Sequence, residues 1–258
     1  MSLNTHSKFY YGYEISGAAL FIDFNEGAGA LFAELEIGSY SLTDALTELA
    51  RALNDAGTLT YTVTVDRTTQ TVTIGASGAV SLLVTSGAHA GTSAFGVFGF
   101  TGADRASLAS HLGNAQAGSS YATQFIVQSY IGPEDYQDAT YGTVNKSASG
   151  QVEVIRFGVE RFHEFNLKYV NDRDHGVGGP IRYNATGIDD LRALMQYLVT
   201  KGPLEFMPDE DDPDVFDKVL LETTADDSKG LKYKLRELYG QNLPGYFETG
   251  ALKFRVIE

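Results

Sequence analysis

The stretch SLTDALTELARALNDAG at residues 41–57 decides the fold of the first half of the chain. Its apolar residues recur at helical spacing and predict an amphipathic helix. Ser41 is a typical N-cap, and Asp44 lies at the positive end of the helix dipole. Gly57 is typical of the left-handed residue that ends a helix. The predicted buried face consists of Leu42, Ala45, Leu46, Leu49 and Leu53.

Strand patterns flank this helix on both sides. Before it, residues 19–24 and 31–37 predict two strands. After it, residues 59–65 and 71–74 alternate β-branched and polar residues around a short polar turn, which indicates a β-hairpin. Residues 80–84 form a further apolar run, and residues 93–100 a small phenylalanine-rich apolar plug.

A small-residue tract at residues 113–120 resembles a flexible connector, so we expect two domains. The first is an α+β module at residues 1–116. The second, at residues 117–258, is β-rich with one helix at residues 188–201 that ends at Gly202 and Pro203. The predicted fold class is α+β and β-rich. In each of the two modules, strands or a β-sandwich pack against one amphipathic helix. Segments 131–150 and 171–187 are predicted loops that could reach neighbouring subunits.

The composition excludes several classes of protein. The chain has 258 residues with 43% hydrophobic side chains, so it is not disordered throughout. It has no cysteine, which excludes disulfides, thiolate zinc sites and a cysteine nucleophile. Its net charge of −14 disfavours nucleic-acid binding across the whole surface. No apolar run is long enough for a membrane helix, and the polar start predicts no secretory signal.

The motif search finds no active site, and we expect no enzyme and no cofactor. Residues 27–32 hold only two glycines of a dinucleotide fingerprint and precede a strand rather than a helix, so they indicate a turn. There is no GxxxxGK[ST] or GxSxG motif and no HxxxH pair. His163, which lies among aromatics, is expected to be half-buried or at an interface. Paired carboxylates of a hydrolase stay an open alternative, because their geometry is spatial.

Two acidic segments are considered for cation binding. Asp172, Asp174 and His175 form the tightest acid and histidine cluster and are candidate ligands of a divalent cation. The alternative is a glycine-rich loop with solvated charges. The run at residues 209–214 lacks the spacing of an EF-hand and is expected to be an exposed loop between Pro208 and Pro213.

Aromatic residues supply the candidates for subunit contacts. The chain has 15 tyrosines and 15 phenylalanines. Such rings are typical of cores and interfaces. The interface candidates are Phe9, Tyr10, Tyr11, Tyr13, Tyr136 and Tyr141. Exposed tyrosines could alternatively bind sugars.

The order of motifs in the first module resembles a small module of tailed-bacteriophage structural proteins. That order is a strand ending at residues 37–43, the helix, the hairpin at residues 61–74, a segment at residues 81–83 and a turn at residues 98–104. The resemblance covers about residues 10–113. The second module is similar in outline to phage tail-tube and distal-tail proteins, because a helix, a Gly-Pro stop, a strand and an acidic loop precede the C-terminal strand at residues 246–257.

The resemblance implies a virion component of the tail, baseplate or neck, made in the host cytoplasm, that forms a homo-oligomeric ring with other tail proteins. It implies no catalysis, no specific nucleic-acid binding and no membrane association. An acidic inner wall would let DNA pass without adhering. The alternative is a receptor- or carbohydrate-binding virion module that recognises a host-surface glycan.

Overall fold

The computed structural model describes residues 7–117, 124–127, 135–146, 152–166, 170–171, 194, 196–198, 202–208, 212, 214–222, 236–237, 246–248 and 251–257. Its fold is β-rich α+β with several sheets, which confirms the predicted fold class. The chain forms two compact units. The N-terminal unit consists of Lys8–Phe125 and Gly202–Phe216. The C-terminal unit consists of Met1–Ser7, Ile126–Lys201 and Asp217–Glu258. Gly202–Phe216 thus belongs with the first half of the chain, although the sequence predicts it in the second module.

Helix α1 (Leu42–Ala56) confirms the central prediction. The Ser41 hydroxyl accepts a hydrogen bond from the Asp44 amide at 3.2 Å, as an N-cap should. All five residues of the predicted apolar face are buried. Burying each leucine contributes about 1.5–3 kcal/mol, so packing rather than propensity holds the helix.

The predicted role of Gly57 is wrong. Its backbone is extended, at φ −96° and ψ 175°, rather than left-handed. Glycine is needed here for another reason. An added Cβ would collide with the Glu26 carboxylate and lie 2.8 Å from the Tyr61 ring. The close approach of the chain behind the helix, not a positive φ, selects this residue.

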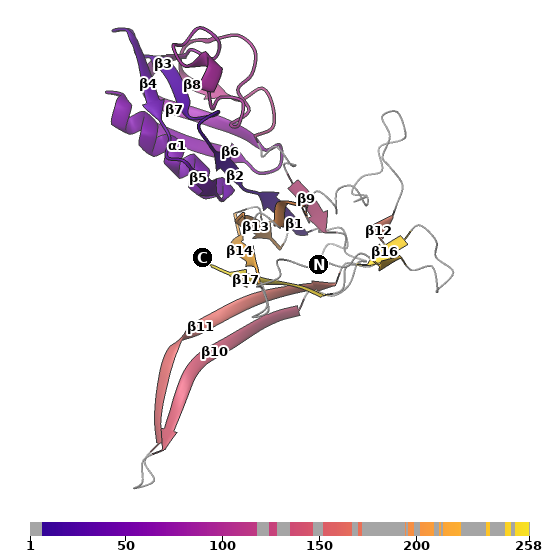
Figure 1. Ribbon diagram of the computed structural model, residues 1–258. Coiled ribbons are helices and arrows are strands. Elements are labelled where there is room, and N and C mark those ends of the chain that lie inside the picture. Colours follow the sequence, from indigo (N-terminus) through magenta and orange to yellow (C-terminus); the bar gives the residue numbers. More distant parts are fainter. Residues whose placement is uncertain are drawn as a thin grey trace. The chain divides into compact units, whose positions relative to one another are not determined.

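A five-stranded antiparallel sheet packs against α1 in the N-terminal unit (Figure 1). Its strand order is β4-β3-β7-β6, and β8 also pairs with β7. The hairpin β6–β7 confirms the predicted turn and continues through the next apolar run. Strand β8 was not predicted. The strands are β3 (Phe21–Asn25), β4 (Ala30–Glu34), β6 (Tyr61–Asp66), β7 (Thr71–Leu82) and β8 (Arg105–Leu112).

Shorter elements complete this unit. Strand β1 (Ser7–Tyr11) pairs with β13 (Leu204–Met207), and β2 (Tyr13–Ile15) pairs with β5 (Gly38–Tyr40). A 3₁₀ turn, η1 (Ala90–Thr92), precedes the predicted apolar plug. Phe95, Phe98 and Phe100 of the plug are buried, as predicted.

The C-terminal unit contains a sheet in the order β10-β11-β17-β14 and a small sheet in the order β12-β16-β15. The prediction of a loop at residues 131–150 is wrong for residues 135–146, which form a long strand paired with β11. Strand β11 continues through Gly158 with a β-bulge beside it: Tyr141 faces Gly158 and Gly142 faces Arg156, so the register skips Phe157. The strands are β10 (Asp135–Lys146), β11 (Val152–Asn166), β12 (Val170–Asn171), β14 (Asp217–Leu221), β15 (Arg236–Glu237), β16 (Tyr246–Glu248) and β17 (Ala251–Val256).

Two other predictions are only partly within the described residues. Leu194 and residues 196–198 are helical, and Leu194 and Leu198 are buried, in agreement with the helix predicted at residues 188–201. Strand β9 (Gln124–Val127) precedes the predicted loop at residues 131–150. The loop predicted at residues 171–187 lies almost entirely outside the described residues. No helix in the described part of the chain is long and apolar enough to cross a membrane.

Candidate functional site

Four of the predicted interface residues lie in the interior of the chain. Phe9, Tyr10, Tyr11 and Tyr13 are at most 2% exposed. The Phe9 ring packs 4.9 Å from that of Phe206, centroid to centroid. Rings buried to this degree are core residues of the single chain and offer no surface to a second subunit.

The remaining predicted site residues are placed only by the backbone or lie outside the described residues. Tyr136 and Tyr141 belong to β10, where they face His163 and Gly158 of β11 in the strand register. Asp172, Asp174 and His175 lie outside the described residues, as does most of the acidic run at residues 209–214. Within the described part, no group of three or more histidine, aspartate or glutamate side chains could hold a metal ion.

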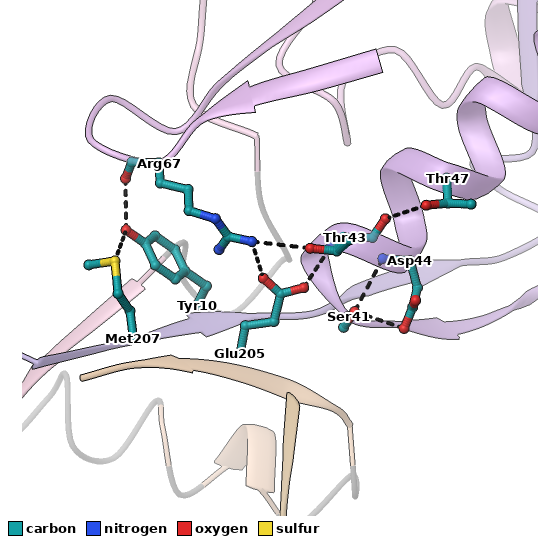
Figure 2. Close-up of polar contacts among 8 residues, drawn as sticks. All are labelled: Tyr10, Ser41, Thr43, Asp44, Thr47, Arg67, Glu205 and Met207. Carbon is teal, nitrogen blue, oxygen red and sulfur yellow. Dashed lines mark hydrogen bonds and ion pairs between the residues drawn. The ribbon is translucent and has the colours of Figure 1, made fainter. Parts of the chain in front are cut away.

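A buried ion pair holds the returning segment of the N-terminal unit to α1 (Figure 2). Glu205 of β13 is fully buried, and its carboxylate lies 2.6 Å from Nη2 of Arg67. The other carboxylate oxygen accepts a hydrogen bond from the Thr43 amide, also at 2.6 Å. Thr43 lies in the first turn of α1, where unpaired amides and the helix dipole favour a negative charge. The Glu205 carboxylate is therefore matched by a cation and by a helix N-terminus.

Aromatic rings surround the Arg67 guanidinium. It lies 3.9 Å from the ring centroid of Phe216 and 5.3 Å from that of Tyr10. The Tyr10 hydroxyl donates a hydrogen bond to the Arg67 carbonyl at 2.8 Å (Figure 2). Burial raises the pKa of the nearby Tyr13 hydroxyl, the Glu205 charge raises it further, and Arg67 partly opposes this. These contacts make the cluster a structural clamp rather than a binding surface.

A second polar cluster is partly open to solvent. The carboxylate of Asp23 on β3 accepts two hydrogen bonds from His89, one from the backbone amide at 2.7 Å and one involving ring Nδ1 at 2.8 Å. Asp23 is buried, whereas the His89 side chain is 28% exposed. Nδ1 is held by the carboxylate, and among the described residues Nε2 has no hydrogen-bond partner.

Two phenylalanines enclose the His89 ring. The Phe21 ring stacks on it at 4.2 Å between centroids, and the Phe32 ring is tilted against it at 4.7 Å. Phe32 is 51% exposed. Among the described residues, no hydroxyl group hydrogen-bonds to the imidazole, so the pair lacks the nucleophile of a catalytic triad. What the cluster offers is a group of packed aromatic rings, here called the aromatic platform (Phe21, Phe32 and His89).

Exposed apolar residues gather on two strands of the same sheet. Phe32 lies on β4, and Leu108 and Leu112, which are 57% and 62% exposed, lie on β8. Single exposed apolar side chains are ordinary, but here they lie on strands that have a partner on one side only within the described residues. These strands are candidates for contacts with another protein chain.

The C-terminal unit contains an extended two-stranded ribbon (Figure 1). Strand β11 pairs with β17 only over residues 162–166, so residues 152–161 pair with β10 alone among the described strands. We call residues 138–146 and 152–161 the arm. The register sets Val144 opposite Val154, and Thr143 opposite Ile155 on the other face.

A charged cluster marks the base of the arm. The His163 side chain is buried rather than half-buried, and its Nε2 lies 2.8 Å from Oδ2 of Asp217. Beside it, Arg255 bridges Glu222 and Glu160 at 3.1 and 3.4 Å. Each acidic group lies beside a histidine or an arginine, so the cluster links β11, β14 and β17 and does not form a surface patch of one charge.

Sequence reasoning missed Glu205, Arg67, Asp23 and His89. One signal was available: Glu205 stands inside the apolar run at residues 203–207, and a carboxylate there must find a partner when buried. Its partner Arg67 could not be found, because the two are 138 residues apart. A scan against models of known protein families found no match to this chain, and a search of curated proteins found none either.

Proposed function

We propose that this chain is a structural subunit of a tailed-bacteriophage virion, in the tail, baseplate or neck. In this role it forms a homo-oligomeric ring and contacts other tail proteins, without catalysing a reaction. It is made in the host cytoplasm and resides in the virion.

The arm is the observation that carries this proposal. An isolated two-stranded ribbon is at best marginally stable in water, and independent stability needs further strands or a packed face. Strand β10 has 12 residues, of which those at 138–146 belong to the arm and correspond to a length of about 30 Å. In the strand register, β-branched residues follow one another along the arm, and no third strand pairs with it among the described residues. A neighbouring subunit would supply the missing cover.

The order of elements adds support. The resemblance to phage structural proteins rests on a strand, a helix, a hairpin and an apolar plug in succession. The described residues contain β4, α1, the β6–β7 hairpin and the buried plug in that order. This succession is compatible with the proposed family.

The mass of the purified full chain in solution tests the proposal. We expect a defined oligomer by native mass spectrometry and ring-shaped particles by electron microscopy. A variant that replaces residues 142–157 by a short turn joins Tyr141 to Gly158, which already face each other in the ladder. This variant should keep its thermal midpoint and lose the ring.

A search of purified virions tests the phage assignment itself. Peptides of this chain should be found by mass spectrometry in particles that band together in a density gradient. A chain that stays monomeric at all concentrations and is absent from such particles would exclude the proposed function.

The aromatic platform supports a second candidate function, binding of a host-surface glycan. Sugar rings stack on exposed aromatic faces, and the free His89 nitrogen could hydrogen-bond a hydroxyl group. A glycan array would distinguish the two functions. Selective binding that disappears in Phe32→Ala would favour the receptor-binding module, whereas a purely structural subunit should bind no glycan selectively.

A further inference from the structure

The sheet of the N-terminal unit ends in two strands that lack an outer partner. Strand β4 pairs with β3 alone, and β8 pairs with β7 alone, among the described residues. An unpaired strand edge presents a row of free amides and carbonyls and readily accepts another strand.

The direction of the backbone groups follows from the neighbouring hydrogen bonds. The carbonyls of Phe21 and Asp23 accept from Ala94 and Leu83, on the side of β3 away from β4. In an antiparallel ladder, facing residues alternate between bonded and non-bonded pairs. Phe32, which faces Asp23, therefore directs its amide and carbonyl outward.

The same reasoning applies to β8. The Gly113 amide donates to the Val72 carbonyl, so the next bonded pair in the ladder is His111 with Ile74. Ser110 and Leu112, on either side of His111, direct their backbone groups away from β7. Phe32 on β4 and Ser110 and Leu112 on β8 therefore direct their backbone groups outward, whereas the outward carbonyl of Glu34 accepts a hydrogen bond from Arg51 at 3.4 Å.

The side chains of these strands are unusual for solvent-exposed edges. Natural edge strands are commonly protected by lysine, proline or a bulge turned outward. The pairing of β8 with β7 contains two register shifts, but β8 has a single charged residue, Arg105, and exposes Leu108 and Leu112. Strand β4 exposes Phe32 and carries one charge, Glu34. In a chain of net charge −14, these nearly uncharged strands are where a second copy meets the least repulsion.

We infer that β8 of one copy pairs with β4 of the next, so that the sheets of neighbouring subunits continue across the interface. The inference rests on the proposed ring and names the surface that closes it. The contact joins two different edges, and such a head-to-tail contact generates a ring when its rotation closes. The remaining edge strand, β6, exposes only Thr62, Thr64 and Asp66 and lacks an apolar anchor.

One antiparallel alignment keeps the directions derived above. With Leu112 opposite Phe32, Ser110 faces Glu34, and these four residues have the outward parity. The exposed side chains of Leu112 and Phe32 then cover each other.

Charges placed on each edge test this inference in the full chain. Leu112→Lys blocks β8, and Phe32→Lys blocks β4. Thr64→Lys is the matched control, because it adds the same charge at an exposed position of β6 in the same sheet. Each protein is first checked for an unchanged thermal midpoint. Assembly is then measured by native mass spectrometry across a concentration series.

We expect Leu112→Lys and Phe32→Lys each to raise the concentration needed for assembly about tenfold or more, and Thr64→Lys to leave it unchanged. An equimolar mixture of the two blocked variants should form heterodimers and nothing larger, because only one intact β4 and one intact β8 can meet. This last result separates two different edges from a symmetric contact.

Three results would overturn the inference. If the wild-type chain never assembles, both the ring and the edge contact fail. If the wild type assembles and the two edge variants assemble equally well, the edge contact fails while the ring stands. If Phe32→Lys assembles normally but loses binding on a glycan array, the edge is a receptor surface and not a contact between subunits.

Discussion

Removal of the Glu205 carboxylate should destabilise the N-terminal unit strongly. In Glu205→Ala, the Arg67 guanidinium loses its partner while remaining 9% exposed, and the Thr43 amide loses its acceptor. Leaving a buried charge unpaired costs about 3–5 kcal/mol. Small domains are stable by only about 5–15 kcal/mol in total, so this variant would lose a large share of its stability.

Urea unfolding measures this loss. The chain has no tryptophan, so tyrosine fluorescence and far-UV circular dichroism are the suitable signals. Hydrogen exchange of the α1 amides assigns the change to the N-terminal unit, because the two units need not unfold together. We expect exchange in α1 to accelerate in step with the fall in the free energy of unfolding.

A double variant separates the charge from the packing. Glu205→Leu combined with Arg67→Met removes both charges and keeps most of the apolar volume. It should lose less stability than the sum of the losses in the two single variants, because neither charge is left unpaired. A loss below about 1 kcal/mol in Glu205→Ala would refute the view that this pair clamps the returning segment to the helix.

Three further predictions concern single side chains of the same unit. Burial alone would raise the pKa of Glu26, but hydrogen bonds, first from Thr58, outweigh it and lower the pKa from 4.5 to about 2. Its stabilising effect is thus complete above pH 4.5 and lost as the pH falls toward 2. In Glu26→Gln, the free energy of unfolding measured in urea should depend less on pH between pH 4.5 and pH 2. Gly99→Ala should cost more than about 1 kcal/mol in urea unfolding, because φ is +78° and the new Cβ would collide with the Ala115 carbonyl. Ser41→Ala should cost about 1 kcal/mol, seen as a lower thermal midpoint.

The sequence predicted the elements that are determined by interactions between residues close together in the chain. Helix α1 followed from its apolar spacing and from the Ser41 cap, both of which lie within the helix itself. The β6–β7 hairpin followed from alternation around a short turn. The Gly57 prediction failed because the reason for glycine lies in Glu26 and Tyr61, which the chain brings close only after folding.

The elements and contacts that the sequence did not predict depend on pairing between residues far apart in the chain. Residues 135–146 contain Asp135, Asp138, Gly142 and Asn145, a composition typical of a loop, yet their pairing with β11 makes them a strand. Strand β8 is rich in alanine and serine and was missed for the same reason. The Asp23 and His89 pair and the Arg67 and Glu205 pair join residues far apart in sequence, which no spacing rule can reveal.

The return of Gly202–Phe216 to the N-terminal unit has a consequence for synthesis on the ribosome. Strand β13 completes the pairing of β1 and supplies Glu205 to the clamp, but it emerges only after all of Ile126–Lys201 has been made. At roughly 5–20 residues per second, several seconds pass in which the nascent unit exposes Arg67 and the aromatic edge of β1. Chaperones that recognise unfinished sheets are expected to bind the chain during this interval, and a transcript truncated before β13 should yield insoluble protein.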